Sequence, residues 1–240
     1  MAERYPGYDV LSKRWTPSWN EQTRQVIDRR LAVSREPRFF SALEWQTLNA
    51  VCDRIMPQPR DRAPVPLAAY VDEKMHDRQL DGYRYAQLPT QGEAWKRGLA
   101  ALEQTARTRH GSGFHRLPPL QQDALLQQMQ RGELNGEAWG GMPCKLFFEH
   151  RVLPDITHAY YAHPVAWNEI GFGGPASPRG YVRMGLDRRD PWEAVEAQSS
   201  DPASAAHASS RSQNQNPRVA RGSESRTVEL EPDSTRSSGR

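Results

Sequence analysis

Residues 39–57, FFSALEWQTLNAVCDRIMP, decide how the rest of the chain folds, because they carry a complete helix signal. Ser41 and Glu44 stand three residues apart, which is the spacing of a capping box at a helix start. Apolar residues then recur three or four positions apart until Met56-Pro57, where the proline ends the helix. These apolar residues are Leu48, Val51, Cys52 and Ile55. The stretch therefore predicts an amphipathic helix with one face turned to a helical core.

Four further helices are expected downstream, each bounded by a proline or glycine turn. The apolar residues of the second are Leu67, Tyr70, Val71 and Met75, before Asp81-Gly82, and those of the third are Trp95, Leu99, Leu102 and Ala106, between Thr90 and His110-Gly111. The fourth begins at Pro118-Pro119 and carries Leu120, Ala124 and Met129, and the fifth begins at Pro143 and carries Leu146, Phe147 and His150. Pro154 is expected to kink or end this last helix near Leu153. No segment alternates long enough to predict a sheet, so the chain is expected to be mainly α.

The chain is expected to divide into three parts. Residues 1–38 form an N-terminal extension with a short helix opening at Ser18, where Glu21 completes a capping-box spacing. Residues 39–192 form an irregular helical domain that finishes in an extended segment rich in aromatic residues, glycine and proline. Residues 193–240 have almost nothing to bury, so we expect a disordered tail, because such a segment cannot offset the entropy lost on ordering.

The charge composition argues against a nucleic-acid partner. The 240 residues carry a formal net charge of +3, with 32 basic and 29 acidic residues, and only four of the basic residues are lysines. Phosphate binding requires basic residues clustered on one face, whereas many arginines here adjoin acids, as in Asp61-Arg62 and Asp77-Arg78. We therefore expect no nucleic-acid partner and keep a basic nucleic-acid-binding helical protein as an alternative.

No targeting segment or direct membrane span is expected. The N-terminus has no apolar run, and Arg35 and Glu36 interrupt the apolar segment that would have to follow Arg29-Arg30 in a twin-arginine signal. The chain is therefore expected in the cytoplasm, or in the periplasm only if a signal-bearing partner exports it.

Sequence signatures of catalysis and metal binding are missing. The chain has no phosphate-binding P-loop motif, no HExxH, no GxSxG and no GxGxxG between a strand and a helix. Cys52 and Cys144 match no metal, haem or disulfide spacing and are expected to be small buried apolar residues. His150 and His158 would lie about 12 Å apart on a straight helix at about 1.5 Å per residue, too far to share one metal ion. A stand-alone enzyme with an unrecognised site is the other alternative.

The segment from Trp139 to Trp192 differs from the rest because it concentrates aromatic residues on irregular backbone. The chain has 7 Trp, 8 Tyr and 6 Phe, and nine of these lie in this segment among glycines and prolines. The glycines at positions 171, 173 and 174 precede Pro175 rather than a helix N-terminus, so they favour a tight turn over a phosphate cradle. So many rigid aromatic side chains either fold back on the chain's own helices or lie on another protein.

Two motifs together carry a resemblance to a known family. The first is Phe39-Phe40-Ser41-x-x-Glu44-x-x-x-Leu48-x-x-Val51-x-x-x-Ile55-Met56-Pro57, and the second is Tyr160-x-x-His163-Pro164-x-x-Trp167-x-x-Ile170-Gly171-Phe172-x-Gly174-Pro175. With these motifs the chain resembles the gluconate 2-dehydrogenase subunit 3 family over about residues 39–185. This family comprises the small subunits of bacterial flavin-dependent sugar and sugar-acid dehydrogenases.

The resemblance implies a helical accessory subunit with no catalytic residue, metal or cofactor of its own. Its partner would be a large subunit of the GMC (glucose–methanol–choline oxidoreductase) type, which holds FAD and oxidises the sugar. A cytochrome c subunit would belong to the complex where one is present. The small subunit would assist the folding, stability and export of the large one.

The expected partner interface lies around Trp139 and residues 160–181. Trp167, Phe172 and Tyr181 are the expected aromatic anchors, and the glycines are expected to allow close backbone contact. The candidate interface residues are Trp139, Tyr160, His163, Pro164, Trp167, Ile170, Gly171, Phe172, Gly173, Gly174, Pro175 and Tyr181.

Overall fold

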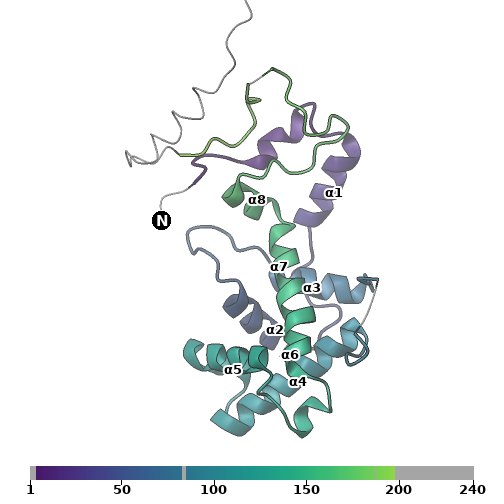
Figure 1. The fold of residues 1–240 in the computed structure, drawn as a ribbon, viewed down its shortest axis with the longest axis vertical. Helices are drawn as coiled ribbons and strands as arrows, with labels where there is room; N and C mark the ends of the chain where they lie inside the picture. The colour runs from purple at the N-terminus through teal and green to yellow at the C-terminus, as the bar shows by residue number, and fades with distance from the viewer. Residues whose placement is uncertain (1–3, 83–84, 187, 198–240) are drawn as a thin grey trace, which may run out of the picture. The chain divides into compact units, whose positions relative to one another are not determined.

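The computed structural model describes residues 4–82, 85–186 and 188–197, and these are organised by helices alone (Figure 1). The α-helices are α1 (Glu21–Leu31), α2 (Ala42–Ile55), α3 (Leu67–His76), α4 (Gln91–His110), α5 (Pro119–Arg131), α6 (Cys144–Phe147), α7 (Leu153–Tyr161) and α8 (Pro164–Ile170). Three short 3-10 helices, η1 (Val10–Trp15), η2 (Phe114–Arg116) and η3 (Glu137–Trp139), and one π-helical turn, η4 (Phe148–Val152), complete the set. The predicted mainly α class is confirmed.

Helix α2 forms as its sequence predicts. The Ser41 hydroxyl accepts a hydrogen bond from the Glu44 backbone N–H, and the Glu44 carboxylate accepts one from the Ser41 N–H at 2.8 Å, so both halves of the capping box are present. Leu48 and Val51 are fully buried on the inner face. The helix thus begins and ends where its cap and Pro57 require.

The main core, the buried cluster that includes Leu48, Trp95, Leu102, Phe147 and Ile156, is built from α2 to α7. The Trp95 indole lies at its centre with no exposed surface and meets the Phe147 ring edge to face at 5.4 Å. Gly98, one turn along α4, permits this approach, because an added Cβ would lie 2.3 Å from the Phe147 ring. A small residue at this position therefore sets the distance between α4 and α6.

Two buried carboxylates tie the main core together. Asp155 on α7 accepts hydrogen bonds from Trp95 Nε1 on α4 and from Lys74 Nζ on α3, both at 2.8 Å. Asp72 on α3 accepts from the backbone N–H groups of residues 38, 39 and 40, at 2.8 to 3.0 Å. Each carboxylate is buried with both oxygens hydrogen-bonded, and hydrogen bonding of this kind is what allows a charge to be buried.

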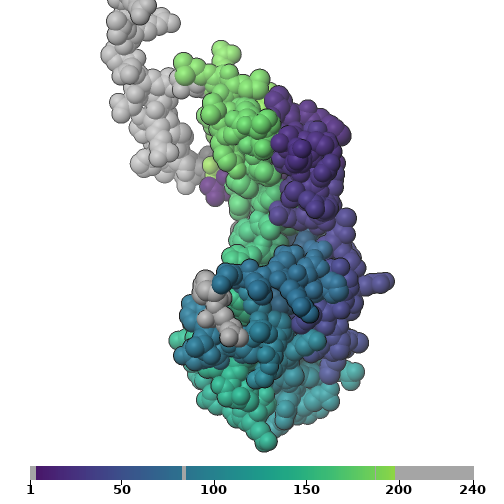
Figure 2. All heavy atoms as spheres, turned by 90° about the vertical axis from the view of Figure 1, so that its right-hand side faces the viewer, coloured from purple at the N-terminus to yellow at the C-terminus, as the bar shows by residue number. Residues whose placement is uncertain are grey.

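A second apolar cluster, here called the N-terminal cluster, consists of Val10, Trp19, Ile27 and Trp167. It joins the N-terminal extension to α8, which lies about 150 residues further along the chain. The backbone around Trp19 also pairs with Ser177, with Asn20 N–H to Ser177 O at 2.7 Å and Ser177 N–H to Ser18 O at 2.8 Å. Figure 2 shows the N-terminal residues lying directly against this later segment.

Four details differ from the sequence expectations. Helix α1 is capped by Asn20, whose side chain accepts from Thr23 N–H, and not by Ser18, which is buried against Ser177. Helix α3 ends at His76, five residues before Asp81, because Arg78 adopts a positive φ of 52°. Leu120 is 83% exposed, and Leu125 and Leu126 supply the apolar face of α5 in its place.

The fourth detail concerns Pro154, for which the sequence left a kink or a helix end open, and of these two alternatives the helix end is wrong. The chain continues as α7 to Tyr161, after the π-helical turn η4. Proline lacks an N–H and its ring crowds the carbonyl four residues earlier, so a wider turn at that point lets the helix run on. The predicted disordered tail lies almost wholly outside the described residues, and its first residues contact the N-terminal segment through an Arg4–Glu196 ion pair of 2.8 Å.

Replacing Asp72 with alanine is expected to lower the free energy of unfolding by about 3 kcal/mol, because the buried Phe40 N–H and two partly buried N–H groups lose their acceptor, and a buried N–H left unpaired costs about 1–3 kcal/mol. Urea denaturation measures the change. Asp77→Ala is the matched control, since Asp77 follows the same helix but makes only a half-exposed contact of 3.9 Å with Arg38. The control is expected to lose under about 1 kcal/mol. Equal losses in the two variants would contradict the anchoring role of Asp72.

Candidate partner-binding site

Helix α8 starts at a buried histidine. His163 Nδ1 accepts the Val165 N–H at 3.2 Å, and Pro164 occupies the first helical position, where its missing N–H leaves no bond unmade. Burial, followed by repulsion from the nearby Arg30 and Arg62, lowers the pKa of His163 to about 4. The imidazole is therefore neutral near pH 7, as an acceptor cap requires.

Trp167 is held from several sides. Its ring meets Phe172 edge to face at 5.7 Å, and the Arg30 guanidinium lies 5.9 Å from its centre. Its Nε1–H donates to the Tyr161 carbonyl at 2.7 Å. With 5% of its surface exposed, Trp167 belongs to the chain's own core.

Tyr160 lies at the junction of α7 and α8 in a small polar network. Its hydroxyl donates to the Glu169 carboxylate and accepts from Arg62 Nη2 at 3.2 Å, and Arg62 also pairs with Glu169. Burial, followed by the bond to Glu169, raises the pKa of Tyr160 to about 12. The phenol therefore stays protonated and fixes α8 against the end of α7.

The glycines after α8 allow a close approach, as the sequence suggests, but the approaching groups belong to the N-terminal extension. Gly171 has a φ of +66°, and a Cβ there would lie 2.5 Å from the Tyr5 ring. Gly174 also has a φ of +66° and would bring a Cβ to 3.1 Å from Val10. Gly173 offers its carbonyl to the Lys13 ammonium. The tight turn is thus packed against the first residues of the chain.

The twelve sequence-predicted interface residues fall into two groups. The buried or partly buried group is Trp139, Tyr160, His163, Pro164, Trp167, Gly171, Gly173, Gly174 and Pro175. The exposed group is Ile170 (50% exposed), Phe172 (40%) and Tyr181 (73%). The three residues of this second group are the most exposed of the twelve.

Trp139 is not brought together with the others. It belongs to η3, before α6, and packs in the main core with its ring 6.3 Å from Phe147. Helices α6 and α8 lie at opposite ends of α7 in Figure 1. The structure therefore places Trp139 away from the residues around α8.

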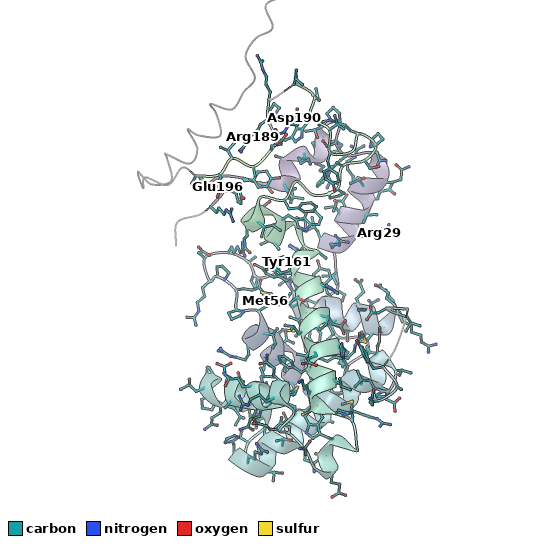
Figure 3. The ribbon with its side chains drawn as sticks, in the orientation of Figure 1. Arg29, Met56, Tyr161, Arg189, Asp190 and Glu196 are labelled. Atoms are coloured by element: carbon teal, nitrogen blue, oxygen red, sulfur yellow. The ribbon has the colours of Figure 1, made fainter. Side chains whose placement is uncertain are left out.

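Sequence reasoning missed three exposed apolar residues that follow Tyr181, namely Val182, Met184 and Leu186. Two ion pairs, Arg179–Asp190 and Arg183–Glu193, hold this loop, and Asp190 also accepts the Met184 N–H at 3.1 Å. Figure 3 shows Asp190 on this segment beyond α8 and Tyr161 where α7 gives way to α8. The sequence Tyr-Val-Arg-Met-Gly-Leu at residues 181–186 could have indicated this exposure. Its apolar residues belong to no helical repeat that would bury them.

The described part of the chain shows no group of His, Cys, Asp and Glu side chains arranged to hold a metal ion. His150 stacks on the Tyr85 ring at 3.8 Å, and Asp155 is occupied by Trp95 and Lys74. Cys52 and Cys144 are buried free thiols. None of the helices that the structure describes has the length and apolar character needed to cross a membrane.

The sequence model of gluconate 2-dehydrogenase subunit 3 matches residues 42–174, from the start of α2 to the glycine turn after α8. The chain belongs to the gluconate 2-dehydrogenase subunit 3 family. No curated protein and no solved structure gave a match. The matched region leaves residues 1–41 and 175–240 on either side of it, and the described portions of these two flanking parts pack against each other.

Replacing Trp167 with alanine is expected to lower the free energy of unfolding of the isolated subunit by about 3–5 kcal/mol, the usual cost of removing a buried indole. Thermal or urea unfolding measures this. Ile170→Ala, at the exposed end of the same helix, is the control and is expected to cost under about 1 kcal/mol. If the Trp167 variant were as stable as the control, Trp167 would not be a core residue.

Acid is expected to destabilise the subunit through His163. The unfolded imidazole binds a proton below about pH 6.5, whereas the folded one stays neutral down to about pH 4. The unfolded state therefore binds more protons in this window, so stability falls as the pH is lowered from 6.5 to 4. Thermal unfolding across this range tests it. His163→Asn keeps a cap acceptor without titrating and should show a flatter profile. Identical profiles would refute the assignment.

Proposed function

We propose that this chain is the non-catalytic small subunit of a flavin-dependent, GMC-type sugar or sugar-acid dehydrogenase, and that it binds and stabilises the large FAD subunit. It contributes no redox group of its own. The large subunit holds FAD and performs the oxidation, and a cytochrome c subunit accepts electrons where the complex contains one. Assistance with maturation or export of the large subunit is part of the same proposal.

The observation that carries the proposal is a set of exposed apolar side chains at the end of the family motif. Ile170 and Phe172 lie exposed at the close of the matched region, and the apolar loop continues with Tyr181, Val182 and Met184. Exposed apolar side chains gathered in one region are typical of protein interaction sites. Their backbone is fixed by the buried Trp167 and by the ion pairs of the loop, so little conformational entropy is lost on docking.

The arginines lend no support to nucleic-acid binding. Many of them pair with carboxylates of the chain itself, as Arg54 does with Asp123 at 2.6 Å and Arg183 with Glu193 at 3.0 Å. Paired side chains of this kind leave little free positive charge for a phosphate backbone.

Co-purification tests the proposal. The subunit is co-expressed with a candidate GMC-type flavoprotein, sought first in the neighbouring reading frames, and we expect one complex that oxidises a sugar with an artificial electron acceptor. The purified chain alone should show no turnover. Failure of the two proteins to associate, or turnover by the chain alone, would contradict the proposal.

Replacing Ile170 and Tyr181 together with serine is expected to weaken the complex at least about tenfold, because exposed aromatic and aliphatic anchors carry much of the binding energy of an interface. Phe172 is left in place, since its ring packs against the buried Trp167. The unfolding temperature of the isolated subunit should change little. Leu120→Ser is the matched control, since Leu120 is an exposed apolar residue on α5. Equal weakening in both variants would show that the effect is not local to the site.

A further inference from the structure

A cavity of about 250 Å³ lies beside the glycine turn that follows α8. Its wall is formed by Lys13 of η1, Ser18, Gly171, Gly173, Ala176, and residues 179–183, 190 and 192–194. Most of these residues fall outside residues 42–174, the region that the family model matches. The cavity is therefore built mainly by the two parts of the chain that flank the matched region.

Lys13 is the unusual residue of this cavity. It is only 5% exposed, and its ammonium donates to the Gly173 carbonyl. An ammonium has three N–H donors, and no other acceptor and no carboxylate partner of Lys13 is found among residues 4–82, 85–186 and 188–197. A buried cation without a counter-ion is costly, so lysines are rarely buried unless they are paired.

The other charges of the cavity cancel one another. Arg179 pairs with Asp190, and Arg183 pairs with Glu193 at 3.0 Å. Asp190 and Glu193 also accept backbone N–H groups, from Met184 and Asp190 respectively. Lys13 is thus the one cation on the cavity wall that lacks a carboxylate partner among the described residues.

Lys74 provides a comparison within the same chain. Burial acts to lower its pKa, but its hydrogen bonds to Asp155 and Asp81 overcome this effect, so the pKa of Lys74 is raised. Burial, followed by repulsion from Arg179, lowers the pKa of Lys13, and the more distant Glu193 and Asp190 do not compensate. The two pKa values shift in opposite directions because Lys74 is in direct contact with carboxylates and Lys13 is not.

We propose that this cavity binds a carboxylate, which pairs with the Lys13 ammonium. A carboxylate offers acceptors only, matching the unused donors of Lys13, and its single charge matches the single unbalanced cation. A phosphate dianion is disfavoured, because its two negative charges exceed the single unbalanced cation on the cavity wall. The volume lies below the roughly 300–1,000 Å³ of typical small-molecule pockets, which suits one short carboxylate-bearing chain.

The carboxylate has two chemically equivalent sources: a small free organic acid, or an acidic side chain of a partner protein. The exposed side chains of Tyr181 and Val182 line the cavity and supply apolar contact to the carbon chain in either case. The site does not require the proposed function, because a free acid would bind the isolated chain. Two experimental arms separate the sources.

The first arm uses the full chain alone with sodium acetate and sodium gluconate as probes. Backbone amide resonances of Gly173 and Gly180 are followed by NMR at constant ionic strength, with chloride and inorganic phosphate as comparison anions. Both carboxylates are expected to shift these resonances saturably, and chloride is not. At about ten times the dissociation constant the site is about nine-tenths occupied, so the shifts should be near their limit.

Lys13→Met is the test variant, because it keeps an unbranched chain of similar length and removes the charge. It is expected to abolish the carboxylate-dependent shifts while leaving circular dichroism unchanged. Lys145→Met is the matched control, since Lys145 is an exposed lysine outside the cavity, 3.8 Å from Glu149. Its shifts should equal those of the unsubstituted chain. Equal shifts in the Lys13 variant would place the carboxylate elsewhere and overturn the proposal.

The second arm uses the complex with the flavoprotein. Carbodiimide coupling joins an amine to a contacting carboxylate, so a Lys13 amide to an acidic residue of the large subunit would assign the source to the partner. In that case Lys13→Met weakens the complex at least about tenfold, because the carboxylate of the large subunit is left buried without its cation. Carboxylate binding without complex formation would contradict the proposed function and would still support this inference. Absence of both free-acid binding and coupling at Lys13 would overturn the inference.

Discussion

The buried Asp155 carboxylate is the contact on which the rest of the structure depends. It accepts hydrogen bonds from Trp95 on α4 and Lys74 on α3, so three helices meet at one group inside the main core. A buried charge of this kind is tolerated only while its partners stay in place, which makes the arrangement of these helices specific. Because Asp155 belongs to α7, the same contact fixes the direction in which the chain leaves toward α8 and the candidate site.

Local signals predicted much of the fold. Helix α2 follows from its capping box and apolar spacing, and the close of α4 follows from Gly111 in a left-handed conformation. Prediction failed where two signals compete: Ser18 has a capping-box spacing, yet Asn20 caps the helix because Ser18 is engaged by the backbone at Ser177. Leu120 has an apolar side chain in a helix, but the position of α5 on the core turns it outward.

The candidate site was harder to predict, since an aromatic residue has the same sequence signature in a core and at an interface. Trp139 and Trp167 are both buried within the chain, whereas Phe172 and Tyr181 are exposed, and nothing in their local sequence separates them. The contacts that decide the matter join residues about 160 positions apart, such as Lys13 and Gly173. Neither periodicity nor a turn motif encodes pairings of that length.

The packing of Tyr5, Val10 and Trp19 over α8 has a practical consequence for recombinant work. A fragment trimmed to residues 42–174, the limits shared with the family, would leave the indole of Trp167 facing water on one side and would lack the loop that carries Asp190. Such a fragment would expose an aggregation-prone apolar surface that the N-terminal residues cover in the intact chain. Expression boundaries should therefore enclose at least residues 4–197, so that the N-terminal residues and the segment they pack against are both present.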